Sequence, residues 1–168
     1  LSRTEEGLAL PAPLEHTMVI AAVDLPALGV EYEKVPPHIT VLPWMDISRV
    51  EDEFMSGATA ICENSAILAI NPFKEILVGP ASDIPAQQVK SDGLILVHHE
   101  LFDLAEDLGV RFQNPEWLGE GYNPHLTEGY LSSSLVVRAL VVIFNAKREN
   151  SNRGKKVVSA VLPLGQNL

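Results

Sequence analysis

The sequence has a single cysteine, Cys62, among its 168 residues, which excludes a disulfide within the chain. This usage is compatible with the reducing cytoplasm, where we expect the protein to reside. Long apolar runs are also lacking, because the run at 135–144 contains Arg138 and is too short to span a bilayer. The stretch from Leu1 to Glu6 has neither the basic nor the apolar segment of a signal peptide. We therefore expect no membrane partner.

Positive charge is scarce as well, with 12 Lys and Arg against 22 Asp and Glu and a net charge of −10. A general nucleic-acid coat protein needs many basic residues to displace counterions, so the net charge argues against this class. Five basic residues nevertheless share one short stretch, where only Glu149 offsets them: Lys147, Arg148, Arg153, Lys155 and Lys156. The stretch is either a solvated loop between two strands or a local lip that attracts phosphate.

Apolar residues make up 46% of the chain, enough for a core and too many for disorder. Residues 1–14 read as an irregular arm because of Pro11 and Pro13, and residues 15–168 as a single domain of two lobes. β-Branched and apolar runs predict strands at 17–23, 38–42, 66–70, 75–78, 135–144 and 157–162, with a short extended piece near 88–90. Pro43 is expected to close the second strand.

Two helices are predicted from apolar residues that recur every three to four positions. The first is expected after Ser48, whose spacing to Glu51 is that of a capping box, and its apolar face runs from Phe54 to Ile61. The second spans 94–108 and ends before Gly109, a natural C-terminal residue. Strands outnumber helices and their connections favour antiparallel pairing, so the predicted class is α+β.

The tripeptide His-x-Thr occurs twice, as His38-Ile39-Thr40 and His125-Leu126-Thr127, each directly after a proline. Residues two apart in a strand point to the same face, so each copy presents an imidazole beside a hydroxyl. The copies lie about half a chain apart, which suggests an internal duplication with the two motifs facing each other.

Two histidines and two threonines around one substrate suit acid–base chemistry on a phosphodiester. One neutral and one protonated imidazole coexist near neutral pH, as base and acid. The hydroxyls of Thr40 and Thr127 would donate hydrogen bonds to the non-bridging oxygens. A single His-x-Thr would be read as structural, but a matched pair favours a shared catalytic role. No metal and no cofactor are expected, and which histidine acts as the base stays open.

These motifs resemble those of the two-histidine (2H) phosphoesterase superfamily, which includes RNA 2′,3′-cyclic phosphodiesterases, bacterial 2′–5′ RNA ligases and enzymes that cleave 2′–5′ oligoadenylates. Its members carry two H-h-[ST]-h motifs, where h is hydrophobic. The run from 38 to 41 fits fully, whereas Glu128 stands where the second motif has a hydrophobic residue. The order of elements over 15–165 also agrees, as does the passage through Phe112, Pro115 and Gly119 into the second motif.

The resemblance implies a bilobal, pseudo-symmetric fold in which antiparallel sheets line a central cleft and helices pack outside. It implies that His38 and His125 are catalytic and that Thr40 and Thr127 bind phosphate, with Glu128 pointing away from the cleft. Three aromatic residues near the motifs are candidates for stacking on a nucleobase, with core or rim packing as the alternative: Trp44, Tyr122 and Tyr130. The pair His98-His99 is expected to be structural, since adjacent helical residues chelate metal poorly.

The first hypothesis for function is therefore an enzyme: a metal-independent phosphoesterase that cleaves, or reversibly ligates, 2′-linked or 2′,3′-cyclic phosphodiesters. Its partner would be a nucleotide or oligonucleotide, such as an RNA end, a 2′–5′ oligonucleotide or a cyclic oligonucleotide. The alternative is a non-catalytic nucleotide- or RNA-binding module that retains the same cleft. A third possibility is an interaction domain in which the two motifs are accidental. Physiological substrate, regiochemistry and oligomeric state are not encoded in any motif.

Overall fold

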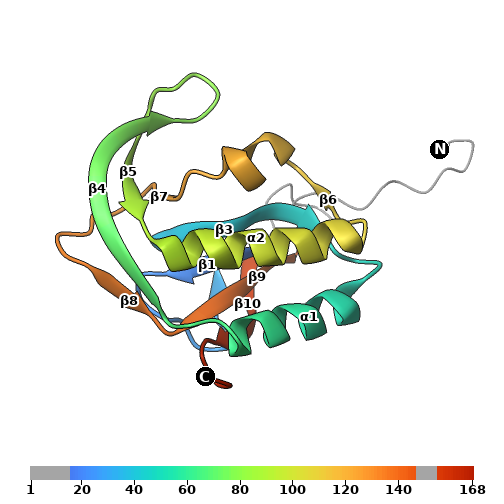
Figure 1. Cartoon of the computed structure of the whole chain (residues 1–168). Helices are drawn as coiled ribbons and strands as arrows, with labels where there is room; N and C mark the ends of the chain where they lie inside the picture. The colour runs from blue at the N-terminus through green and yellow to red at the C-terminus, as the bar shows by residue number, and fades with distance from the viewer. Residues whose placement is uncertain (1–15, 147–154) are drawn as a thin grey trace, which may run out of the picture.

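The computed structural model describes residues 16–146 and 155–168, and its architecture is the predicted α+β class (Figure 1). Its two α-helices are α1 (Glu51–Glu63) and α2 (Asp92–Asp107). Its strands are β1 (Thr17–Ala22), β2 (Glu31–Tyr32), β3 (His38–Asp46), β4 (Leu68–Val78), β5 (Ile84–Lys90), β6 (Arg111–Phe112), β7 (His125–Leu126), β8 (Leu135–Val137), β9 (Ala139–Ala146) and β10 (Lys155–Pro163). Within the described ranges no helix is long and apolar enough to cross a membrane.

All strands join one antiparallel sheet in the order β2-β10-β9-β1-β3-β7-β5-β4-β8, with β6 beside β3. The two motif strands, β3 and β7, are neighbours in the middle of this order. The flank on the β3 side combines β1 and β2 with the C-terminal strands β9 and β10, whereas β4 and β5 lie on the β7 side. The two flanks therefore interleave in sequence, and neither is a simple half of the chain.

The main core lies between the sheet and the two helices, and it confirms the predicted apolar faces. From α1 it takes Phe54, Ala58 and Cys62, all fully buried. Burial raises the pKa of the Cys62 thiol to about 12, so this group stays protonated and unreactive at neutral pH. The second helix contributes Leu94, Val97, Leu101 and Ala105. Its ends are well defined, since Ser91 caps the first turn through Leu94 N–H and Gly109 follows with a φ of +73°.

A smaller apolar cluster lies on the opposite face of the sheet, against which neither α1 nor α2 packs. Five buried residues of β1, β9 and β10 form it: Met18, Ile20, Val141, Ile143 and Val158. Partly buried side chains of the segment between β1 and β3, among them Val30 and Val35, pack against this cluster together with Trp44. The sheet thus buries apolar side chains on both faces of its β1–β9–β10 flank.

Two predicted boundaries, one at the end of β3 and one at the start of α1, are wrong. Pro43 does not close a strand, because β3 continues to Asp46. The register against β1 shifts between the pairs Val19–Leu42 and Thr17–Met45, so the missing N–H of Pro43 falls in an irregular stretch of the ladder. The capping box of Ser48 is also absent. Its hydroxyl donates to Asp46 instead, and α1 begins at Glu51 without a side-chain cap.

Two further predictions about strands are wrong because the partners of these strands lie far away in the sequence. The segments 66–70 and 75–78 are not separate strands, since 68–70 and 75–78 belong to the single strand β4, which pairs with β5 and β8. The run 135–144 is two strands that part at Arg138: β8 joins β4, and β9 joins β1 and β10. Strands β8 and β9 are consecutive in the chain but lie near opposite ends of the strand order, so the sheet must curve strongly.

Candidate active site

The two His-x-Thr motifs meet where β3 and β7 pair. Ile39 lies opposite Leu126, and both side chains are fully buried in the core on the helix side. This register sets Thr40 opposite His125 and His38 opposite the position of Thr127. Because side chains alternate across a strand, His38, Thr40 and His125 share the other face, which we call the motif face, and Thr127 follows directly after the end of β7. Across such a pair, opposite Cβ atoms lie about 5 Å apart and diagonal ones about 7–8 Å, so the histidines are diagonal neighbours.

Each motif histidine is held by the same local hydrogen bond. The Nδ1 atom of His38 lies 2.8 Å from the carbonyl oxygen of Pro36, and that of His125 lies 2.7 Å from the carbonyl oxygen of Asn123. A carbonyl only accepts, so Nδ1 must carry the proton in both rings. Each Nε2 is then left to accept a proton, or to donate one when the ring is charged. In both cases the acceptor is two residues before the histidine, with a proline between.

A ligand can reach these groups. His38, Thr40 and His125 are half-buried and Thr127 is exposed, so none of the four side chains is sealed inside the core. Partial burial also strengthens hydrogen bonds to an anion relative to bulk water. The arrangement places two imidazoles and the Thr40 hydroxyl on one accessible patch of sheet, with Thr127 directly after it.

The environment of His38 favours its neutral form. Burial lowers its pKa, and the positive charge that His125 can carry acts in the same direction. The carbonyl of Pro36 and the carboxylate of Glu128 oppose this by stabilising the cation. Glu128 is itself paired with Lys34, whose Nζ lies 2.5 Å from Glu128 Oε1. Although Glu128 is expected to point away from the cleft, its charge acts on the His38 ring. Strand β7 ends at Leu126, so strict alternation no longer directs residue 128 away.

The exposed ion pair between Lys34 and Glu128 predicts two shifts of the His38 pKa with opposite signs. Glu128→Gln removes a charge that stabilises protonated His38, so we expect its pKa to fall further. Lys34→Gln leaves the Glu128 carboxylate without its ion partner, so the His38 pKa is expected to rise. Both shifts should shrink at high salt, because the pair is solvent-exposed. Titration of the His38 ring by NMR measures this without relying on activity. Shifts of the same sign in both variants would contradict the assignment.

An aromatic pair behind the motif face ties the second motif to the first. The Tyr122 ring stacks on His98 at 3.8 Å between centroids and 8° between planes, and its hydroxyl donates to the Thr40 carbonyl at 2.8 Å. His98, on α2, is fully buried and donates from Nδ1 to the Val41 carbonyl, also at 2.8 Å. Its Nε2 accepts from Gly119 N–H at 3.0 Å. Both ring nitrogens are thus used, which confirms the structural role expected for His98.

A second tie joins the turns around the motifs. Gly129 follows the second motif with a φ of +93°, a conformation that side chains rarely adopt. A Cβ at this position would lie 3.2 Å from the Cβ of Pro37, the residue before His38. Two independent reasons therefore favour glycine at position 129: its positive φ, and the short distance to Pro37 before the first motif.

The three aromatic stacking candidates occupy different environments. Tyr122 gives a ring face to His98 and its hydroxyl to Thr40, contacts that favour the packing alternative over a base-stacking role. Trp44 lies on the motif side of the sheet, half-buried against the smaller apolar cluster. Tyr130 is 69% exposed on the segment after β7. Stacking by Trp44 and Tyr130 stays a prediction.

The basic stretch from Lys147 to Lys156 is only partly described. Residues 147–154 lie outside the described residues, and Lys155 forms an ion pair with Glu31 at 3.5 Å.

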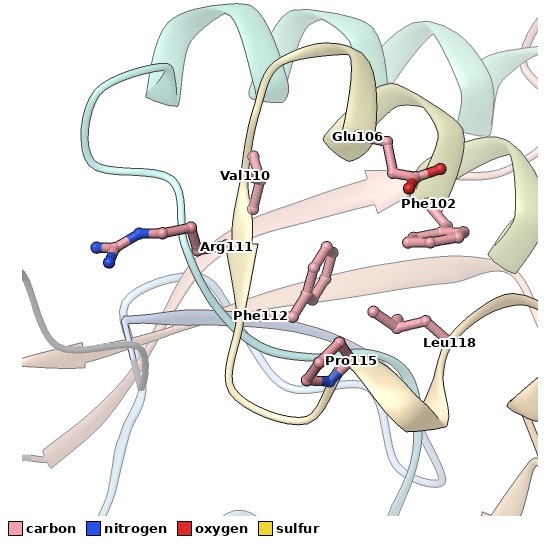
Figure 2. A pocket seen from close by; sticks show the side chains of 7 residues that line it. All are labelled: Phe102, Glu106, Val110, Arg111, Phe112, Pro115 and Leu118. Carbon is pink, nitrogen blue, oxygen red and sulfur yellow. The ribbon is translucent and has the colours of Figure 1, made fainter.

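A hollow of about 570 Å³ lies elsewhere, between the C-terminal half of α2, β6 and the 3₁₀ turn Pro115–Trp117 (Figure 2). Its lining is mostly apolar and consists of Phe102, Glu106, Val110, Arg111, Phe112, Pro115 and Leu118. Arg111 points away from the aromatic rings in Figure 2, and its guanidinium bonds Asp46 at 3.2 Å. Strand β6 pairs with the end of β3 remote from His38, so this hollow is separate from the motif face.

Comparison with known proteins shows likeness in structure without likeness in sequence. No protein-family model and no curated protein sequence matches the chain. A crystal structure of a phosphoesterase aligns with a TM-score of 0.60 at 11% identity, covering 90% of this chain and 99% of that one. TT0787 of Thermus thermophilus aligns at 0.61 and 11% identity, covering 91% and 100%. LigT of E. coli, solved in complex with NADP+, aligns at 0.57 and 12% identity, covering 90% and 98%.

The fold of the chain is thus the fold of these proteins over nearly its whole length. This is the outcome that the resemblance to two-histidine phosphoesterases predicted for the architecture. At such low identity the likeness establishes the fold alone, and the argument for chemistry rests on the motif residues themselves.

Proposed function

We propose that the protein is a phosphoesterase that cleaves, or reversibly ligates, 2′-linked or 2′,3′-cyclic phosphodiesters by two-histidine acid–base catalysis. One observation supports this most directly. His38 and His125 each donate Nδ1–H to the carbonyl two residues earlier, so two Nε2 atoms are left for chemistry on the same face. A histidine that served packing alone would have no need of this repeated arrangement beside a matching hydroxyl.

The reaction on a 2′,3′-cyclic phosphate would proceed as follows. One neutral imidazole takes a proton from water as the water oxygen bonds to phosphorus. The bond from phosphorus to one ribose oxygen breaks, and the second imidazole, protonated beforehand, gives its proton to that oxygen. The lowered pKa of His38 makes it the better candidate for the neutral partner in this direction. In ligation the two roles reverse. No step of this sequence requires a metal ion.

The threonines would stabilise the negative charge on the non-bridging oxygens of the phosphate. Thr40 lies opposite His125 in the register, and Thr127 follows directly after β7, so each hydroxyl would come from a residue beside one end of the β3–β7 pair. Donors fixed before the reaction stabilise a transition state more than mobile water does. A 2′-phosphorylated nucleotide also fits the neighbour solved with NADP+, since the adenosine ribose of that ligand carries a 2′-phosphate.

The substrate class can be tested with a panel incubated in EDTA and followed by mass spectrometry. It should contain nucleoside 2′,3′-cyclic phosphates, a 2′–5′ adenylate oligomer, and cyclic di- and trinucleotides. We expect turnover of at least one member, with a bell-shaped dependence on pH, as two titrating imidazoles require. Binding without turnover across the panel at pH 5–8 would reject the enzyme and favour the nucleotide-binding module.

A further inference from the structure

A lateral row of residues extends from the catalytic motifs toward the outer strands of the β7 flank. His125 pairs with Thr40 on one side and with Gln88 of β5 on the other. Gln88 therefore lies on the motif face, and its Nε2 donates to Asn123 Oδ1 at 2.7 Å, next to the carbonyl that holds His125. The row continues from Gln88 to β4, where the ladder is irregular.

That irregularity is a β-bulge level with the catalytic row. The register passes from Pro72–Val89 to Glu75–Gln87, so Phe73 and Lys74 together oppose the single residue Gln88. A bulge bends its strand and re-aims side chains that regular alternation would direct elsewhere. Phe73 remains 49% exposed, which is unusual for a large apolar ring in the middle of a sheet.

Two ammonium groups surround the exposed ring. Lys90 lies two residues after Gln88, hence on the motif face, and its Nζ is 3.7 Å from the centroid of Phe73. Lys74 Nζ is 5.5 Å from the same centroid. Among the described residues, neither lysine is in an ion pair with a carboxylate, whereas Lys34, Arg111 and Lys155 are. In a protein with a net charge of −10, two lysines outside any ion pair beside a half-exposed aromatic ring offer the contacts that an aromatic anion needs.

We propose that Phe73 and Lys90 form a subsite for a second nucleotide, next to the one whose phosphodiester lies between His38 and His125. This proposal rests on the proposed function and specifies an oligonucleotide over a mononucleotide as the preferred substrate. A base stacks on the ring of Phe73, and the ammonium of Lys90 moves to the phosphate of that nucleotide. Two inter-strand spacings, about 10 Å, separate the bulge from His125, a distance that one nucleotide with its base can span.

The test compares a ligand that fills only the catalytic position with one that reaches the bulge. Adenosine 2′,3′-cyclic phosphate is the first, and a 2′–5′-linked adenylate trimer is the second. Dissociation constants of both are measured by calorimetry in a His125→Ala background, which prevents turnover. Phe73→Leu and Lys90→Gln are the test variants. Leu77→Ala, an apolar residue 61% exposed on the same strand, and Arg49→Gln, an exposed cation near α1, are the matched controls.

We expect Phe73→Leu to weaken trimer binding about tenfold, as loss of one base–aromatic stack does, and Lys90→Gln to weaken it through loss of a phosphate contact, while binding of the cyclic mononucleotide is unchanged. The effect of Lys90→Gln should fade as salt rises. Both controls should bind as the parent does. Equal weakening of both ligands, unchanged trimer binding in both test variants, or no trimer binding by the parent would overturn the subsite.

The outcome for the subsite is separable from that for the enzyme. If no ligand is turned over by the unmodified protein but the trimer still loses affinity in the Phe73 and Lys90 variants, the subsite stands and the proposed catalysis fails. If the cyclic mononucleotide is turned over and the trimer does not discriminate, only the subsite fails. Thermal melts of all variants identify any loss that comes from unfolding.

Discussion

Alanine in place of either motif histidine is expected to reduce turnover by about 100- to 10,000-fold, the range that a single general acid or base supplies. His38→Ala removes one of the two proton-transfer groups, and His125→Ala removes the other. Neither imidazole packs in the main core, so both variants should fold. The measurement is initial rate on the substrate that the panel identifies, in the presence of EDTA.

The double variant sharpens this test. Because the two histidines act in one reaction, removing both should cost little more than removing one. The matched control is His99→Gln, a half-buried histidine on α2 that is remote in sequence from both motifs and should retain full rate. Unimpaired turnover in either His38→Ala or His125→Ala would refute the catalytic assignment, and a strictly multiplicative double variant would refute a shared step.

Replacement of the buried histidine His98 is expected to destabilise the protein by roughly 3 kcal/mol or more. His98→Ala leaves the Val41 carbonyl and the Gly119 N–H without partners, at a cost of about 1–3 kcal/mol each. It also removes the stack on Tyr122, worth about 0.5–1.5 kcal/mol. Urea unfolding at pH 7 measures the change in free energy of unfolding. A loss below about 1 kcal/mol would show that the buried hydrogen bonds are replaced by other contacts.

The same residue predicts how stability depends on pH. Burial lowers the pKa of His98 below its ordinary value of 6.5, so the unfolded chain takes up the proton more readily than the folded one. Stability from this group is therefore complete above about pH 6.5 and is lost as the pH falls below it. His38 contributes with the same sign. His98→Phe, which keeps a stacking ring, should show a weaker decline of stability toward pH 5 than the parent.

The parts of the site that were predictable from sequence are those fixed by local geometry. The residues on each side of Ile39 must share a face of a strand, so an imidazole beside a hydroxyl could be expected there from the sequence. The apolar stripe of α2 and its end before Gly109 follow from the 3.6-residue period and from the φ that glycine tolerates. Each of these depends only on residues a few positions apart.

The parts that were missed depend on partners far away in the chain. Ser48 has the spacing of a cap, yet Asp46 accepts its hydroxyl because Arg111 and β6 hold that carboxylate at the end of β3. The aromatic ring of Tyr122 is suited to stacking on a nucleobase, but the buried ring of His98 stacks against it instead. The bulge in β4 becomes visible only when the register against β5 is known. No local pattern encodes which strands will meet.

The junction between β3 and β7 has a mechanical consequence. The two flanks of the sheet share one register pair there, Ile39 with Leu126, because β7 is only two residues long. A phosphate bound by one histidine from each strand would link the two flanks across this short β3–β7 pairing. Substrate affinity and the stability of the pairing would then be coupled: a substrate that binds more tightly stabilises the pairing more, and a change that destabilises the pairing weakens substrate binding.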